Sequence, residues 1–64
     1  MKTHIAELIY QESRISEAGV ELRNLYNALA DDFEGTELLG RFDSYVDNLS
    51  AEAQTLYRQI KGKL

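Results

Sequence analysis

Residues 38–64, with the sequence LLGRFDSYVDNLSAEAQTLYRQIKGKL, repeat their apolar side chains every seven positions. One heptad position is taken by Leu39, Val46, Ala53 and Ile60, and another by Phe42, Leu49 and Leu56. The first half of the chain repeats the spacing with Leu8, Ile15, Leu22 and Leu29. A repeat of this kind is typical of a helix that packs lengthwise against another helix. The sequence therefore predicts an all-α fold.

The clearest break between helices is the acidic run DDFEGT at residues 31–36. Gly35 can adopt the left-handed conformation that ends a helix, and Thr36 can cap the helix that follows. Thr3 is a candidate cap for the first helix, and Glu37 and Arg41 are spaced to pair on the second. We predict a single helical domain over residues 1–64, with a helix over 3–32, a turn over 33–35 and a helix over 36–61, that is, a long antiparallel helical hairpin.

Two places could interrupt these helices. Residues 13–19 contain two serines and a glycine, and Ser50 with Ala51 and Glu52 resembles the start of a helix. If both helices break there, the chain forms a compact three- or four-helix domain. The heptad phase passes through both places unchanged, whereas a loop usually shifts it. The uninterrupted hairpin is therefore the preferred prediction, and a compact three-helix bundle is the alternative.

The width of the apolar stripe on the second helix predicts more than one neighbour. At about 100° per residue, the stripe covers about 120°, which is too wide for a single partner helix. Two hairpins packed face to face would give each helix two neighbours, so the sequence favours a homodimer that forms an antiparallel four-helix bundle. The core of this bundle is predicted to contain Leu8, Ile15, Leu22, Leu29, Leu39, Phe42, Val46, Leu49, Leu56 and Ile60.

In length, turn position and lack of cysteine, this layout resembles the small plasmid-encoded Rop-type hairpin dimers. The resemblance covers the whole chain and concerns architecture alone. The resemblance assigns no functional residue in this sequence.

Composition narrows the classes of function. The chain has 64 residues, 11 acidic and 7 basic, no Cys and one His, His4. These counts exclude disulfides, thiolate metal sites and a His cluster, and the acidic turn lacks the ligand spacing of a calcium loop. No Ser–His–Asp set or glycine-rich phosphate loop is present in the sequence. We therefore expect no enzymatic activity, no cofactor and no metal.

The formal net charge of −4 indicates the kind of partner. Nucleic-acid binding requires clustered Lys and Arg, so a protein is the expected partner and nucleic acid is not. The sequence contains no run of about 20 apolar residues that would cross a membrane and no apolar signal segment. The expected location is the cytoplasm.

Two surfaces are candidates for binding a protein partner. Three apolar residues of the first helix fall on one ridge outside the main stripe, where they either form a contact surface or complete the dimer core. Among seven acids in residues 31–52, two are not explained by the helix dipole. The candidate contacts are the ridge residues Ile5, Ile9 and Val20 with the nearby Tyr10, and Asp43 and Asp47 as an electrostatic second patch.

The predicted function is that of a small regulator, inhibitor or adaptor that binds another protein as a homodimeric bundle. One alternative is an acidic nucleic-acid mimic that blocks a nucleic-acid-binding protein. A second alternative is a Rop-like nucleic-acid-binding hairpin that uses Lys2, Arg14, Arg23 and the basic C-terminal end.

Overall fold

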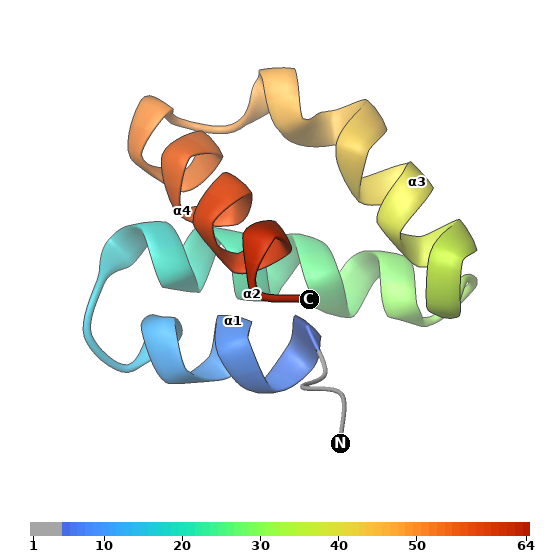
Figure 1. Cartoon of the computed structure of the whole chain (residues 1–64), viewed down its shortest axis with the longest axis horizontal. Coiled ribbons are helices and arrows are strands. Elements are labelled where there is room, and N and C mark those ends of the chain that lie inside the picture. The colour runs from blue at the N-terminus through green and yellow to red at the C-terminus, as the bar shows by residue number, and fades with distance from the viewer. Residues whose placement is uncertain (1–4) are drawn as a thin grey trace.

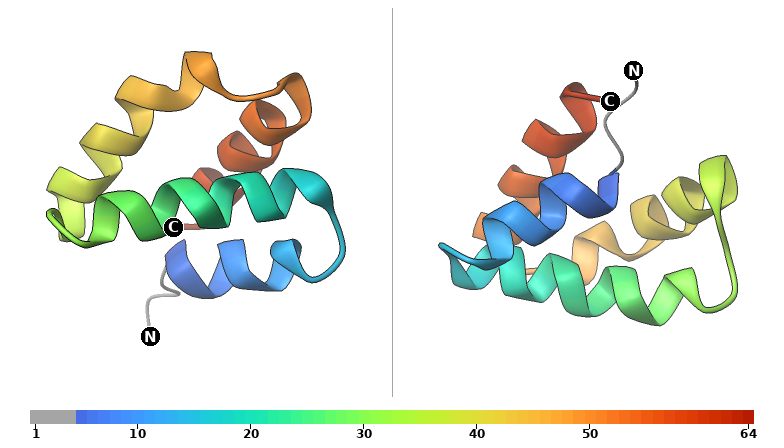
Figure 2. Two further views of the ribbon diagram at one scale, coloured as in Figure 1. Left: turned by 180° about the vertical axis from the view of Figure 1, so that it is seen from behind. Right: turned by 90° about the horizontal axis from the view of Figure 1, so that it is seen from below.

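The computed structural model describes residues 5–64, which form four α-helices and one turn of 3₁₀ helix (Figure 1). The bounds are α1 Ile5–Ser13, α2 Glu17–Ala30, α3 Gly35–Tyr45, η1 Val46–Asn48 and α4 Ala51–Gly62. No strand is present in these residues, and the all-α prediction is confirmed. Helices α1 and α2 lie antiparallel, α3 and η1 rise away from the end of α2, and α4 returns across α1 and α2 (Figure 2).

The prediction of a long helical hairpin is wrong. The predicted helix over 3–32 is replaced by α1 and α2, and the predicted helix over 36–61 is replaced by α3, η1 and α4. A continuous helix of either length would run about 40–45 Å, whereas the longest dimension of the described chain is 28 Å. The compact alternative is correct in kind, with four helices instead of three, and the resemblance to Rop-type hairpins does not hold.

Ser16 makes the first break. Its backbone is extended, and its hydroxyl oxygen accepts a hydrogen bond from the N–H of Gly19 at 3.0 Å, which caps α2. A serine that satisfies backbone groups locally competes with helix continuation, and as an N-cap it is worth about 1 kcal/mol. The turn that precedes it carries Ile15, which is 77% exposed. The prediction that Ile15 is a core residue is therefore wrong.

Ser50 makes the second break. Its hydroxyl oxygen accepts a hydrogen bond from the N–H of Ala53 at 3.2 Å and caps α4, after an extended Leu49. The backbone N–H of Ser50 donates to the carboxylate of Glu21 on α2 at 2.9 Å. The backbone N–H of Ser50 has no partner within a helix, and backbone donors need an acceptor. Its hydrogen bond to Glu21 attaches the α3–α4 connection to α2.

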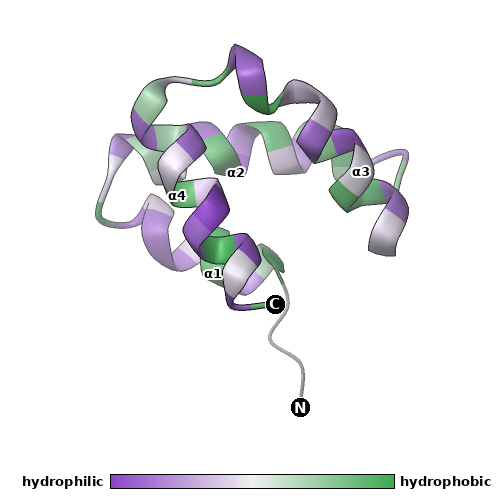
Figure 3. Cartoon of the chain, turned by 45° about the horizontal axis from the view of Figure 1, so that its top comes forward, coloured by the Kyte–Doolittle hydropathy of each residue, from purple (hydrophilic) through white to green (hydrophobic). Residues whose placement is uncertain are grey.

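One hydrophobic core is shared by all four helices. The buried residues are Ile9, Leu22, Leu29, Leu38, Phe42, Ala53, Tyr57 and Ile60. Of the other residues predicted for the core, four are partly buried and pack against this cluster, namely Leu8, Val46, Leu49 and Leu56. Along each helix the ribbon alternates between hydrophobic and hydrophilic segments, as expected for amphipathic helices that cover one core (Figure 3).

Gly19 allows α1 and α2 to approach closely. A Cβ atom added at Gly19 would overlap the backbone of Glu12 and Ser13 at the end of α1. Backbone atoms cannot move aside as the end of a flexible side chain can, so this position requires glycine. By contrast, a Cβ atom at Gly40, in the middle of α3, would meet nothing within 4 Å.

These two glycines give a matched pair of substitutions. We expect Gly19→Ala to lower the free energy of unfolding by about 2 kcal/mol or more, since it forces α1 away from α2. Gly40→Ala is expected to raise it by about 0.5–1 kcal/mol, because alanine loses less backbone entropy in a helix. Urea denaturation followed by circular dichroism measures both. A Gly19→Ala protein as stable as the parent would contradict the close packing of α1 on α2.

Candidate protein-binding groove

An open apolar groove of about 750 Å³ lies between the start of α1, the end of α2 and the first half of α3. Its volume is within the range of binding pockets for small molecules or for a few protein side chains. The apolar lining consists of Ile5, Ala6, Tyr26, Ala30, Phe33, Leu38, Leu39 and Leu64, and the edge consists of Glu34, Gly35 and Thr36. We call this surface the apolar groove.

The turn between α2 and α3 opens the groove. The N–H of Phe33 donates to the carbonyl of Leu29 at 2.9 Å, which closes the last turn of α2. Gly35 then takes a positive φ of 61°, in the left-handed region that glycine adopts without strain. The left-handed Gly35 agrees with the sequence, but the N-cap position of α3 is Glu34 and not Thr36. From this point α3 diverges from α2 (Figure 2). Residues of both helices line the groove.

Two leucines of the groove are not used by the core. Leu39, which the heptad predicts as a core residue, lines the groove and does not belong to the core cluster of residues 5–64. Leu64 follows α4 and is 43% exposed. Apolar side chains gathered in a concave surface mark interaction sites more often than single exposed ones do.

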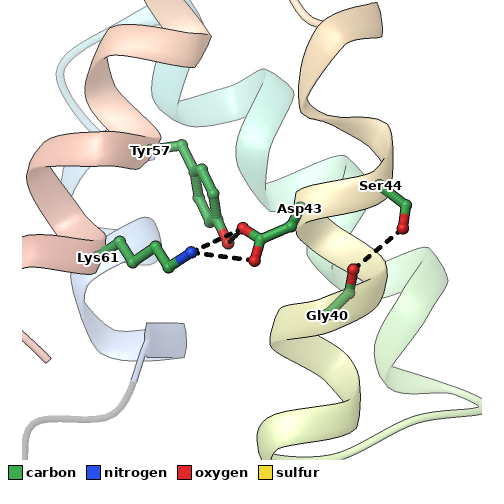
Figure 4. A network of polar contacts seen from close by, with 5 residues as sticks. All are labelled: Gly40, Asp43, Ser44, Tyr57 and Lys61. Carbon is green, nitrogen blue, oxygen red and sulfur yellow. Dashed lines mark hydrogen bonds and ion pairs between the residues drawn. The ribbon is translucent and has the colours of Figure 1, made fainter.

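A set of side-chain contacts joins α3 to α4. The rings of Phe42 and Tyr57 stack with their centroids 4.7 Å apart and an interplanar angle of 5°. The hydroxyl of Tyr57 donates to the carboxylate of Asp43 at 2.6 Å, and the ammonium of Lys61 donates to both oxygens of that carboxylate at 3.0 and 2.9 Å (Figure 4). We call these four residues the α3–α4 clamp. Phe42 and Asp43 lie about one helical turn after Leu38 and Leu39 on α3, and Tyr57 and Lys61 precede Leu64 on α4. The clamp therefore ties α3 to α4.

The clamp shifts the pKa values of two of its members. The hydrogen bond from Tyr57, followed by that from Lys61, lowers the pKa of Asp43 below its usual value of 3.8. Burial of the ring, followed by the hydrogen bond to Asp43, raises the pKa of Tyr57 above its usual value of 10.0. The clamp therefore favours an ionised Asp43 and a protonated Tyr57.

One edge of the groove is acidic. The connection between α2 and α3 and the first turn of α3 carry Asp31, Asp32, Glu34 and Glu37, all of them exposed. We call these four residues the acidic turn. No Lys or Arg occurs in residues 24–40.

Arg41, which the sequence pairs with Glu37, lies instead over the ring of Phe33, 4.5 Å from its centroid. Within residues 5–64, the ion pair that forms is Asp43 with Lys61, away from the acidic turn.

The apolar ridge predicted on the first helix does not form. Ile9 is fully buried, so its prediction as a partner contact is wrong. The break at Ser16 places Ile9 and Val20 on separate helices, and Val20 is 37% exposed in the first half of α2. Ile5 lines the apolar groove.

Unlike Ile5, Tyr10 does not line the apolar groove. Its hydroxyl donates to the side chain of Asn27 at 2.9 Å. The rings of Tyr10 and Tyr26 pack edge to face, with their centroids 6.4 Å apart. Tyr10 therefore supports the packing of α1 on α2.

Asp43 and Asp47 are both exposed. The charge of Asp43 is paired with Lys61 in the α3–α4 clamp, whereas Asp47 lies in η1. The predictions made for Lys2, Thr3 and His4 lie outside the described residues. Among residues 5–64, no three acidic or histidine side chains gather as they would around a metal ion. None of the helices in that range is both long enough and apolar enough to span a bilayer.

The sequence interpretation missed the groove residues Tyr26, Ala30, Phe33 and Leu38, and it assigned Leu39 to the core. The available signal was Phe33, an aromatic residue in an otherwise acidic turn, followed by the adjacent leucines 38 and 39. Neither feature identifies a groove until α3 is known to leave α2 at an angle.

A scan of protein-family models, a search of curated proteins and a search of solved structures each found no match to this chain.

The clamp predicts how stability depends on pH. Asp43 has a lower pKa in the folded than in the unfolded chain, so its contribution is present above pH 3.8 and is lost as the pH falls below that value. Tyr57 has a raised pKa, so its contribution is present below pH 10.0 and is lost as the pH rises above it.

The variant Tyr57→Phe keeps the stack on Phe42 and removes the hydroxyl. We expect it to lower the free energy of unfolding by about 1 kcal/mol at neutral pH. The difference from the parent protein should shrink at both ends of the pH range, in acid as Asp43 is protonated and in alkali as the unfolded tyrosine ionises. Urea denaturation across the pH range measures this difference, and a difference that stays constant above pH 10.0 would contradict the hydrogen bond to Asp43.

Proposed function

We propose that this protein is a non-enzymatic protein-binding module, an adaptor or inhibitor that holds an apolar segment of another protein in the apolar groove. The observation that carries the proposal is a groove of about 750 Å³ whose leucines at positions 39 and 64 remain outside the core. The chain buries a core of its own, so these leucines are not needed to complete it.

The chemistry of the lining supports binding. The polar side chains of the groove among residues 5–64 are Glu34, Thr36 and Tyr26. Catalysis by proton transfer or by a nucleophile requires groups held within hydrogen-bond reach of one another. No hydrogen bond joins the side chains of these three residues in the described structure.

Helix-in-groove recognition is the binding mode that fits this shape. A groove formed between helices accepts the apolar face of a partner helix, with anchors every three or four residues. Burial of two leucine-sized side chains contributes about 3–6 kcal/mol, and this is offset by the entropy lost on association. The expected affinity is therefore micromolar or weaker.

Homodimerisation remains a prediction, but the width of the apolar stripe no longer supports it. The wide apolar stripe requires two neighbours for each helix, and the breaks at Ser16 and Ser50 supply those neighbours within one chain. A mass measurement in solution distinguishes a monomer from a dimer.

The two alternatives have less support. A nucleic-acid mimic would present Asp43 and Asp47 together, but Asp43 is paired with Lys61. A Rop-like nucleic-acid binder depends on the hairpin, which does not form.

A peptide selection tests the proposal. Peptides of about 12 residues, selected from a random library for binding to this protein, should bind Leu39→Asp at least about tenfold more weakly, since the loss of one leucine contact costs about 1.4 kcal/mol. Leu39 lies outside the core cluster, so the variant should fold, and circular dichroism checks this. Fluorescence polarisation measures the affinities.

The matched control is Ile15→Ser. Ile15 is an exposed apolar residue in the turn before α2, whereas the groove residues Tyr26 and Ala30 lie in the second half of α2. Binding that survives Leu39→Asp, or that is lost equally with Ile15→Ser, would mean that the groove is not the binding site.

A further inference from the structure

The acidic turn lies directly beside the apolar groove. Glu34 belongs to both, and Asp31, Asp32 and Glu37 are within three residues of it in the sequence. Four carboxylates at one edge create a negative potential that favours a cationic ligand next to the apolar surface.

Within residues 5–64, no Lys or Arg side chain forms an ion pair with the carboxylates of the acidic turn. Glu34 is the N-cap residue of α3, yet its side chain makes no capping hydrogen bond. Arg41 lies over Phe33 in this turn but forms no ion pair with its carboxylates in the described residues, and Lys61 is bound to Asp43. The carboxylates of the acidic turn are therefore available to a partner.

A second copy of this chain is a poor occupant for the groove. The basic α4 helix carries Arg58 and Lys61, but its apolar residues Tyr57 and Ile60 are buried in the core. A copy could offer them only by unfolding. Another basic and apolar pair, Arg14 with the exposed Ile15, lies in a turn and provides a single apolar anchor.

We infer that the partner segment is a basic amphipathic helix. Its apolar residues lie against Leu39 and Leu64, and Lys or Arg residues on one flank face the acidic turn. This inference rests on the proposed function, and it adds the chemical class of the partner and the side of the groove that its charges face. Complementary charge at the edge of an interface contributes mainly to specificity and to the rate of association.

Synthetic peptides test the charge of the partner. The probe is an amphipathic peptide of leucine and lysine, about 15 residues long and with leucines every third or fourth position, the length at which isolated helices begin to form. Two controls have the same length, one with glutamate in place of lysine and one with the leucines scattered around the helix. We expect the lysine peptide to bind at least tenfold more tightly than either control.

A pair of double variants locates the charge effect. Asp32→Asn with Glu34→Gln removes two charges from the acidic turn, and Asp47→Asn with Glu52→Gln removes one charge from η1 and one from the first turn of α4. Both variants have the same net charge. The first should weaken binding of the lysine peptide about fivefold and the second should change it less than twofold, as expected for partly exposed ion pairs at an interface edge.

Leu39→Asp separates groove binding from general attraction between charges. This substitution adds a negative charge, so a non-specific attraction to the lysine peptide would become stronger. Binding in the groove requires the opposite result, a loss of at least tenfold. Isothermal titration calorimetry at low and high salt measures each affinity.

The outcomes separate the two proposals. If the lysine and glutamate peptides bind equally and both are lost with Leu39→Asp, the basic partner is wrong and the groove proposal stands. If both double variants weaken binding equally, the acidic turn has no special part and the inference is wrong. If the lysine peptide binds Leu39→Asp as tightly as the parent protein, both proposals are wrong. An increase in affinity with Ile15→Ser would show that a second copy occupies the groove and would also overturn the inference.

Discussion

The stacked rings of Phe42 and Tyr57 hold α3 against α4, and the position of α3 depends on this contact. Phe42 is fully buried, and Tyr57 directs its hydroxyl to Asp43 at 2.6 Å, where Lys61 also binds. A buried tyrosine needs a partner for its hydroxyl, and a carboxylate is a strong acceptor. The contact fixes α3 at one end while the turn at Gly35 carries its other end away from α2. The apolar groove is the space that this geometry leaves open.

The chain reaches a core of its own because its helices are short. Sixty-four residues are near the lower limit for an unaided hydrophobic core. Breaking the predicted hairpin at Ser16 and Ser50 allows four amphipathic helices to face one core, where two long helices would need a second chain to cover their stripes. The close approach at Gly19 brings α1 onto α2 without space between the backbones. The apolar residues that line the groove are then a property of the folded chain.

The heptad pattern identifies much of the buried surface and fails at the breaks for a physical reason. Leu22, Leu29, Phe42 and Ile60 are buried. The pattern keeps its phase across Ser16 and Ser50 because the helices on both sides of each break face the same core, so periodicity cannot reveal a change of direction. Ile15 fits the heptad but lies in the turn, and Ile9 falls outside it but is buried, because α1 folds back onto α2 and α4. The groove was not predictable, since its lining comes from four separate parts of the chain.

The sequence by itself determined the helical class, the acidic turn that divides the chain, the left-handed glycine at position 35 and the apolar face of each helix. It also contained both cap residues, Ser16 and Ser50, without showing that they would be used. The tertiary structure decided that point, because the contacts that favour the breaks are long-range. The backbone of α1 packs against Gly19 only after the chain has reversed, and the N–H of Ser50 finds Glu21 only when the α3–α4 connection lies on α2. The groove depends on the same contacts, since an angle between helices is set by what packs between them and not by the pattern along either one.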